Sequence, residues 1–297
     1  MKRILLALSI AASALLLASA AIAAEPEASP ATAPAVAPAA EVAPAAAPAP
    51  SPAEVKAPLP ARNTADVGKK GSYSIGVFNP LTVALVDGLE LQTQPLLFFI
   101  SPNVLFRVDH GKVGDLRIAG EYGVYCPTPA MKLAQGWLFP TWGKSGNQVG
   151  WFLVPSVGIV GTVGEQKGST FTLAMDLTVG IPLTRNDTTS IVGIAPLDDL
   201  FAPVTTGYRY RATATYDLSL LTWLRARAYL GLSLHGNNPS PITMTGGGSL
   251  DFAVGKYSRF TLGFMWWNAD TQAMDQKTHA HVRSNDVFPT IDFIWAG

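Results

Sequence analysis

Apolar and polar side chains alternate with a period of two from about residue 70 onward. Such alternation is typical of β-strands with two different faces. It predicts ten strands, near 72–86, 95–108, 115–125, 149–163, 169–182, 207–219, 223–235, 244–254, 258–269 and 287–296. Val, Ile, Tyr, Phe, Trp and Thr are frequent in these stretches, and Gly, Asn, Asp and Pro gather between them. The sequence predicts an all-β domain, with one short helix near Pro129 to Gln135 in a loop.

Short and long connections alternate between these stretches. The segments near 109–114, 164–168, 219–223 and 255–257 are short, whereas those near 87–94, 126–148, 183–206, 236–243 and 270–286 are longer. An antiparallel up-and-down barrel has this asymmetry, because its turns at one end are short and its loops at the other end are long. We expect about ten strands. Twelve is the alternative, with residues 189–196 in a further hairpin.

Strand length favours a membrane barrel over a soluble sandwich, which also alternates. The stretches are about 11–14 residues, long enough to cross a bilayer when tilted, and strands of soluble domains are usually about 5–6. One face is apolar throughout two consecutive strands, with tyrosines near the ends of the face. This face comprises Tyr208, Tyr210, Ala212, Ala214, Tyr216 and Leu218, then Leu224, Ala226, Ala228, Leu230, Leu232 and Leu234.

Composition agrees with this interpretation. Charged residues make up 14% of the 297 residues and hydrophobic residues 48%, with a formal net charge of +0. The charged share is well below the roughly 25% of soluble domains. The balanced charge gives no reason to expect a nucleic-acid partner, which usually needs a clustered basic patch.

The first 66 residues predict export followed by a tether. Lys2, Arg3 and the apolar stretch after them resemble a signal peptide, with a small-residue cleavage site at residues 21–23, so we assign 1–23 to the signal. Residues 24–66 are largely Ala, Pro, Val and Glu and are expected to be disordered, forming a periplasmic tether that can reach the cell wall. The barrel domain is expected at 67–297. Cys126 is the sole cysteine, so no intramolecular disulfide can form.

These features together resemble the bacterial outer-membrane β-barrel proteins as a broad class. The resemblance implies an integral protein of the outer membrane, in contact with the lipid bilayer and without a structural disulfide. Proteins of this class usually end in an aromatic residue. This chain ends PTIDFIWAG, in which Ile291, Phe293 and Trp295 alternate outward but Ala296 and Gly297 follow. The sequence does not specify an oligomeric state.

Charged residues fall on the face opposite the apolar one. A lipid-facing arginine at mid-bilayer costs about 2–4 kcal/mol, so we expect these side chains to line the lumen. With the first strand running outward, the first two arginines of the 207–235 region lie near the outer mouth and the next two near the periplasmic end. A turn centred on Leu221 would place Asp217 opposite Arg225 and Thr215 opposite Arg227. The predicted lumen set is Arg107, Arg117, Glu121, Asp176, Arg209, Arg211, Asp217, Arg225, Arg227, Asp251 and Asp292.

Mixed signs predict an ion-pair network rather than a ring of one charge, because a buried charge needs a partner. A barrel of about ten strands is narrower than the open channels of 16–18 strands. We therefore expect a narrow or plugged lumen, closed by charge pairs, with a structural or small-solute pore role and no catalysis.

Two other functions remain open from the sequence. His279 and His281 form an H-x-H pair in the region of Asp270, Asp275 and Asp286, which makes them weak candidates for a surface hydrolase at the outer rim. An exported soluble β-protein is the third hypothesis. No motif for a nucleotide, a metal or a catalytic triad is present, so no cofactor and no metal site are expected.

Overall fold

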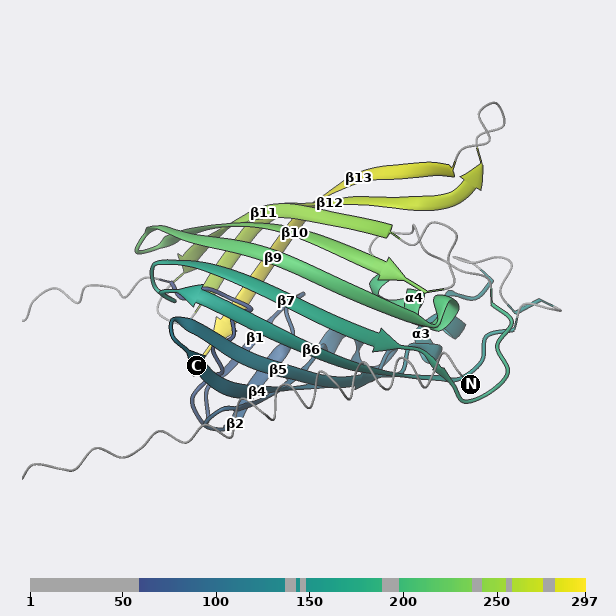
Figure 1. Ribbon diagram of the computed structural model, residues 1–297, viewed down its shortest axis with the longest axis horizontal. Coiled ribbons are helices and arrows are strands. Elements are labelled where there is room, and N and C mark those ends of the chain that lie inside the picture. Colours follow the sequence, from purple (N-terminus) through teal and green to yellow (C-terminus); the bar gives the residue numbers. More distant parts are fainter. Residues whose placement is uncertain are drawn as a thin grey trace, which may run out of the picture. The chain divides into compact units, whose positions relative to one another are not determined.

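The computed structural model describes residues 59–136, 143–144, 148–188, 198–236, 242–254, 258–274 and 281–297. These residues form thirteen strands and three short helices (Figure 1). The strands are β1 (Tyr73–Gly76), β2 (Leu81–Val86), β3 (Leu89–Thr93), β4 (Asn103–Val113), β5 (Leu116–Tyr125), β6 (Phe152–Gly164), β7 (Ser169–Val179), β8 (Ile181–Pro182), β9 (Tyr208–Leu221), β10 (Leu224–His235), β11 (Ile242–Val254), β12 (Ser258–Met274) and β13 (His281–Ala296). The helices are α2 (Pro95–Phe98), α3 (Thr128–Ala134) and α4 (Asp198–Thr206).

Twelve of these strands close into an antiparallel barrel. Neighbours in the sequence pair with one another from β1 to β7 and from β9 to β13, and β7 pairs directly with β9. β1 pairs with β13, which closes the ring. β8 lies outside this count and pairs with the first residues of β6. The predicted all-β up-and-down barrel is therefore confirmed, with the alternative number of strands, twelve, in place of ten.

The two additional strands arise near residue 80, and residues 189–196, the expected source, lie outside the described residues. Asn79-Pro80 turns the chain between β1 and β2, because proline cannot donate a strand hydrogen bond. The stretch 72–86 is thus a hairpin rather than one strand. The segment 87–94, expected to be a long loop, contains β3. The stretch 95–108 begins with α2, which has a proline in its first turn, and becomes β4 only after Pro102.

The turns at one end of the barrel are tight, and we call this the short-turn end. Gly88 and Gly114 adopt positive φ angles of 80° and 61° there, which glycine reaches without strain. Gly297 also lies at this end, bonded to Tyr73 at the start of β1. The opposite, long-loop end carries all three helices, and the β12–β13 hairpin projects there beyond the other strands (Figure 1). The short helix expected near residues 129–135 is present as α3.

The barrel wall is lowest at β1, β2 and β3, which contain only 4, 6 and 5 residues. β13 therefore extends beyond β1, and among the described residues its part before Phe293 pairs with β12 alone. Phe293 and Gly297 direct backbone groups toward β1. Because alternate residues of a strand point the same way, the nitrogen of Pro289 also faces this side. Pro289 is tolerated because no strand requires its missing N–H there.

The two faces of the strands differ in the way the sequence predicts. Tyr208, Tyr210 and Tyr216 are exposed on the outside of β9, and the leucines Leu230, Leu232 and Leu234 are exposed on β10. Arg209, Asp217 and Arg225, which lie on the opposite face, are buried. No helix in the described part of the chain is long and apolar enough to cross a membrane.

Candidate functional site: the charged lumen

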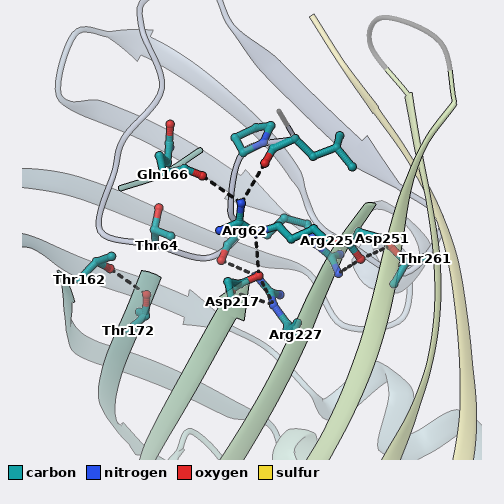
Figure 2. A network of polar contacts seen from close by, with 12 residues as sticks. Arg62, Thr64, Thr162, Gln166, Thr172, Asp217, Arg225, Arg227, Asp251 and Thr261 are labelled. Carbon is teal, nitrogen blue, oxygen red and sulfur yellow. Dashed lines mark hydrogen bonds and ion pairs between the residues drawn. The ribbon is translucent and has the colours of Figure 1, made fainter. Parts of the chain in front are cut away.

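Two carboxylates near the short-turn end each hold two arginines. Asp217 of β9 lies 3.3 Å from Arg225 and 3.1 Å from Arg227, both on β10. Asp251 of β11 lies 3.0 Å from Arg62 and 2.9 Å from Arg259, and Thr261 donates to it at 2.9 Å. Figure 2 shows these carboxylates among the arginines. The side chains of Asp217 and Arg225 are each only 1% exposed, so each depends on the other for its charge balance.

The hairpin register differs from the predicted one by two residues. The turn occupies Thr222 and Trp223, so Asp217 lies opposite Arg227, and a register shift follows Leu224. Thr215 lies opposite Tyr229 rather than Arg227. Asp217 still reaches both arginines, because the guanidinium of Arg225 extends along the inner wall to it. The expected neighbourhood of Asp217 is thus present although the exact pairing was wrong.

The remaining charges of the predicted set also lie on the inner face. Asp176 of β7 contacts Arg209 at 3.0 Å and Arg211 at 2.7 Å. Arg107 pairs with Glu121 across β4 and β5. Asp292 is different, because its carboxylate accepts hydrogen bonds from the backbone N–H groups of Phe78 and Asn79 and so caps the β1–β2 turn.

Arg117 of β5 has a partner that the sequence did not indicate. Its guanidinium lies 2.9 Å from Asp66, inside the segment that we expected to be a disordered tether. Arg62 belongs to the same segment. Such residues were missed because a segment rich in Ala and Pro has no period from which a lumen position could be inferred. Arg259 was missed although its place two residues from Thr261 puts it on the inner face of β12.

Residues 59–68, which we call the lumen strap, cross the short-turn end of the lumen. Arginines of the wall donate to its carbonyl oxygens: Arg225 to Leu59 at 2.9 Å, Arg259 to Pro60 at 2.8 Å, Arg227 to Arg62 at 2.6 Å and Arg107 to Thr64 at 3.3 Å. The N–H of Ala65 donates to Thr162 of β6 at 2.8 Å. The strap therefore runs from the β9–β12 side of the wall to the β3–β6 side. Residues 59–66 belong to the barrel rather than to a tether.

The number of N–H donors at the short-turn end explains why the strap fits there. Four arginines share two carboxylates, and each guanidinium carries five N–H donors. Backbone carbonyl oxygens of the strap accept hydrogen bonds from some of the N–H groups that the two carboxylates leave without an acceptor. Burial and, next, the nearby Arg227 guanidinium lower the pKa of Arg62 to about 10, although Asp251 acts in the opposite direction. Arg62 therefore stays protonated at neutral pH.

The long-loop end is filled differently, by an apolar cluster. Met131 of α3 and Phe201 and Val204 of α4 pack against Phe152 and Val154, which point inward from β6. α3 lies in the expected loop 126–148 and α4 in the expected loop 183–206, whose role the sequence does not indicate. The lumen is thus occupied at both ends, by a polar strap at one and by helices at the other.

The histidine candidates are not described well enough to form a site. His279 lies outside the described residues, and His281 is known only as the first residue of β13. Among the described residues, no group of three His, Cys, Asp or Glu side chains is arranged to hold a metal ion. Cys126 is a free thiol.

Closed strand pairing, an exposed apolar outer face and a buried, ion-paired inner face occur together in this barrel. A soluble barrel would place its polar face outside, in water. The chain is a transmembrane β-barrel. Its surroundings are therefore the lipid bilayer, and a soluble exported protein is excluded by the apolar outer face.

Comparisons with known proteins give no family. No protein-family model and no curated protein matches the chain. Among solved structures, the outer-membrane expressed OmpT of Vibrio cholerae is similar at a TM-score of 0.41 and 7% identity, over 73% of this chain and 64% of that one, so this chain spans less than two thirds of its length. The trimer form of in-vitro folded OmpT gives 0.41 and 7%, over 80% and 72%.

The outer membrane channel DcaP of Acinetobacter baumannii gives a TM-score of 0.36 at 8% identity, over 73% of this chain and 61% of that chain. TM-scores this low do not establish a shared fold. The barrel assignment accordingly rests on the strand pairing and on the two faces of the strands.

Proposed function

We propose that this protein is a narrow-pore barrel of the outer membrane, whose lumen the strap partly closes, and that it has no catalytic activity. The short-turn end faces the periplasm, because outer-membrane barrels have short periplasmic turns and longer external loops. The Ala- and Pro-rich residues before the strap then lie in the periplasm, where they can reach the cell wall. The protein passes only small solutes.

The arginine-to-carbonyl contacts of the strap are the observation that carries this proposal. Arg225 alone donates to Leu59 of the strap and to Gln166 and Gly168 of the β6–β7 turn, at 2.9, 3.1 and 3.0 Å. Each hydrogen bond to a charged group stabilises a folded protein by about 1.5–3 kcal/mol, more than a hydrogen bond between neutral groups does. A segment held by several of them across the opening narrows it permanently rather than transiently.

Planar-bilayer recording tests the closure. The mature chain is expected to give small conductance steps, and a variant lacking residues 24–68 to give larger ones, because the strap is gone. The matched control lacks only residues 24–56 and keeps the strap, so its steps should equal those of the full chain. Equal steps in all three proteins, or large steps in the full chain, would contradict the proposal.

Deletion of the strap leaves Arg117 without Asp66 and exposes other arginines, so folding needs its own check. Heat-dependent mobility in detergent gels reports barrel closure for each variant. The double variant Arg62→Ala/Asp66→Ala removes both side-chain anchors but keeps the strap. It is expected to give intermediate or fluctuating steps.

The absence of catalysis is tested at the two histidines that the sequence singled out. Lipid and peptide turnover is measured for the purified barrel and for His279→Ala/His281→Ala. We expect no turnover above the buffer background in either protein. Turnover that the double substitution abolishes would replace the pore proposal with a surface hydrolase.

A further inference from the structure

Two cavities remain inside the barrel, and they lie along the same part of the wall. One, of about 400 Å³, lies between the strap and the inner side of β1–β3, β12 and β13. The other, of about 440 Å³, lies further toward the long-loop end, against β3, β4, β5 and α2. Pro80 and Gln92 line both. The cavities therefore adjoin at these two residues and form a continuous strip of space beside the shortest strands.

The inner side chains explain why space remains here. The strap is anchored on β4–β6 and on β9–β12, and it approaches β3 only where the N–H of Gly68 donates to Glu90 at 3.3 Å. Opposite it, β1 and β2 present Ser74 and Thr82, whose hydroxyl oxygens lie 2.6 Å apart. Small side chains on this side leave a gap that the arginines fill elsewhere in the lumen.

Charges of both signs line the two cavities. Arg62 and Arg259 share the single carboxylate of Asp251, which leaves one positive charge in excess, whereas Arg107 pairs with Glu121 and Asp66 with Arg117. Glu90, at 9% exposure, has no cationic partner in an ion pair among the described residues. Its carboxylate accepts hydrogen bonds from the amide of Gln92 at 2.7 Å and from Gly68. Gln92 thus connects the unpaired negative charge to the junction of the two cavities.

We propose that the two cavities form one narrow path through the barrel, and that the carboxylate of Glu90 offsets the excess arginine charge along it, so that small cations pass as well as anions. A fixed charge in a constriction with low-dielectric walls concentrates ions of the opposite sign. Rings and single acidic side chains select cations in other pores by the same effect. This inference rests on the proposed narrow pore and adds the route and the residue that offsets its charge.

Reversal potentials in a salt gradient across a planar bilayer test the role of Glu90. The mature chain is expected to pass potassium and chloride with little preference. Glu90→Gln should shift the reversal potential toward a preference for chloride and Glu90→Lys should shift it further, while the single-channel conductance remains measurable. The matched control Asp187→Asn removes a carboxylate that pairs with Arg185 outside both cavities, and should leave the reversal potential unchanged. An unchanged reversal potential in Glu90→Gln and Glu90→Lys would overturn the inference.

A second pair of variants tests the route. Gln92→Trp fills the junction and should lower the conductance, whereas Ala228→Trp places the same bulk on the exposed outer face of β10, lining neither cavity, and should not. Equal losses in both variants would overturn the route. If Gln92→Trp does not fold, Gln92→Cys in a Cys126→Ser background replaces it. A thiol reagent should then block the current, and Glu90→Gln in the same background should speed the block by an anionic reagent relative to a cationic one. An unchanged ratio of the two rates would count against Glu90.

The outcomes separate this inference from the pore itself. Current from the chain lacking residues 24–68, with none from the full mature chain, would overturn the path while leaving the strap as the closing element. No current from either protein, with both folded, would overturn the narrow pore and the path together.

Discussion

Asp217 shows how single residues hold the lumen together. Its two carboxylate oxygens accept from Arg225 and Arg227, and 1% of its side chain is exposed. Neither arginine has another carboxylate within ion-pair distance in the described part of the chain. Removing the charge of Asp217 would leave the buried Arg225 and the half-buried Arg227 with backbone carbonyl acceptors alone.

Asp217→Asn is therefore expected to lower the free energy of unfolding by about 3–5 kcal/mol, the usual cost of breaking a buried pair. Urea unfolding in vesicles, followed by tryptophan fluorescence, measures it. The control is Asp187→Asn, whose partner Arg185 is 83% exposed, and for which about 0–1 kcal/mol is expected. Similar losses in the two variants would mean that water reaches Asp217 freely.

At the scale of single residues, the sequence predicts well which face a side chain lies on wherever apolar and polar residues alternate. Strict alternation placed Asp176, Arg209 and Arg211 on one face, and their contacts follow from that placement. Alternation could not indicate Arg62 or Asp66, because their positions depend on where the strap folds back into the lumen. The dependence of buried arginines on acceptors predicted that partners exist, but not that main-chain carbonyls would be among them.

Among the elements, the long strands β5–β7 and β9–β11 were predicted closely and the short strands β1–β3 were not. The start of β4 was predicted eight residues too early, and the expected loop 270–286 contains the end of β12 and the start of β13. In a long strand many residues follow the same alternation of apolar and polar side chains, which makes the strand easy to recognise. β1 has only four residues and β3 only five, too few for a clear pattern. Asn79-Pro80 and Asp87-Gly88 were the available turn markers between them. The α2 segment, Pro95–Phe98, is apolar enough to resemble a strand, and only its proline at the start indicates a helix.

The outer face of β10 provides a prediction for a whole strand in its environment. Leu230 lies at the middle of the strand and is 62% exposed. Leu230→Arg is expected to lower the free energy of unfolding in vesicles by about 2–4 kcal/mol, and Leu221→Arg, beside the β9–β10 turn, by about 0–1 kcal/mol. Equal, small effects at both positions would be inconsistent with a lipid-facing surface.

For the whole barrel, the contacts of β1 are the shortest in the ring, with two register pairs to β2 and three to β13. Two hydrogen bonds between Tyr73 and Gly297, of 2.8 and 2.9 Å, extend the β1–β13 contact at its end. The other long strands are joined to their neighbours along most of their length. Closure of the ring thus depends on the last two residues of the chain, Ala296 and Gly297, which follow the final aromatic residue.

Deletion of Ala296 and Gly297 is expected to lower the temperature at which the folded gel band converts to the unfolded one. Two lost hydrogen bonds correspond to about 1–3 kcal/mol. A chain extended by two residues after Gly297 keeps the bonds and serves as the control. An unchanged conversion temperature after the deletion would show that the two remaining register pairs, Ile75 with Trp295 and Gly76 with Ile294, suffice.

Pro289 has a consequence for crowded membranes that contain many copies of this barrel. Within the described ranges, the part of β13 above β1 has no strand paired on that side, and open edges of this kind invite strands of neighbouring molecules to add on. The missing donor of Pro289 interrupts the row of groups that an incoming strand would need. Two barrels that meet at this side are thereby kept from joining into a continuous intermolecular sheet.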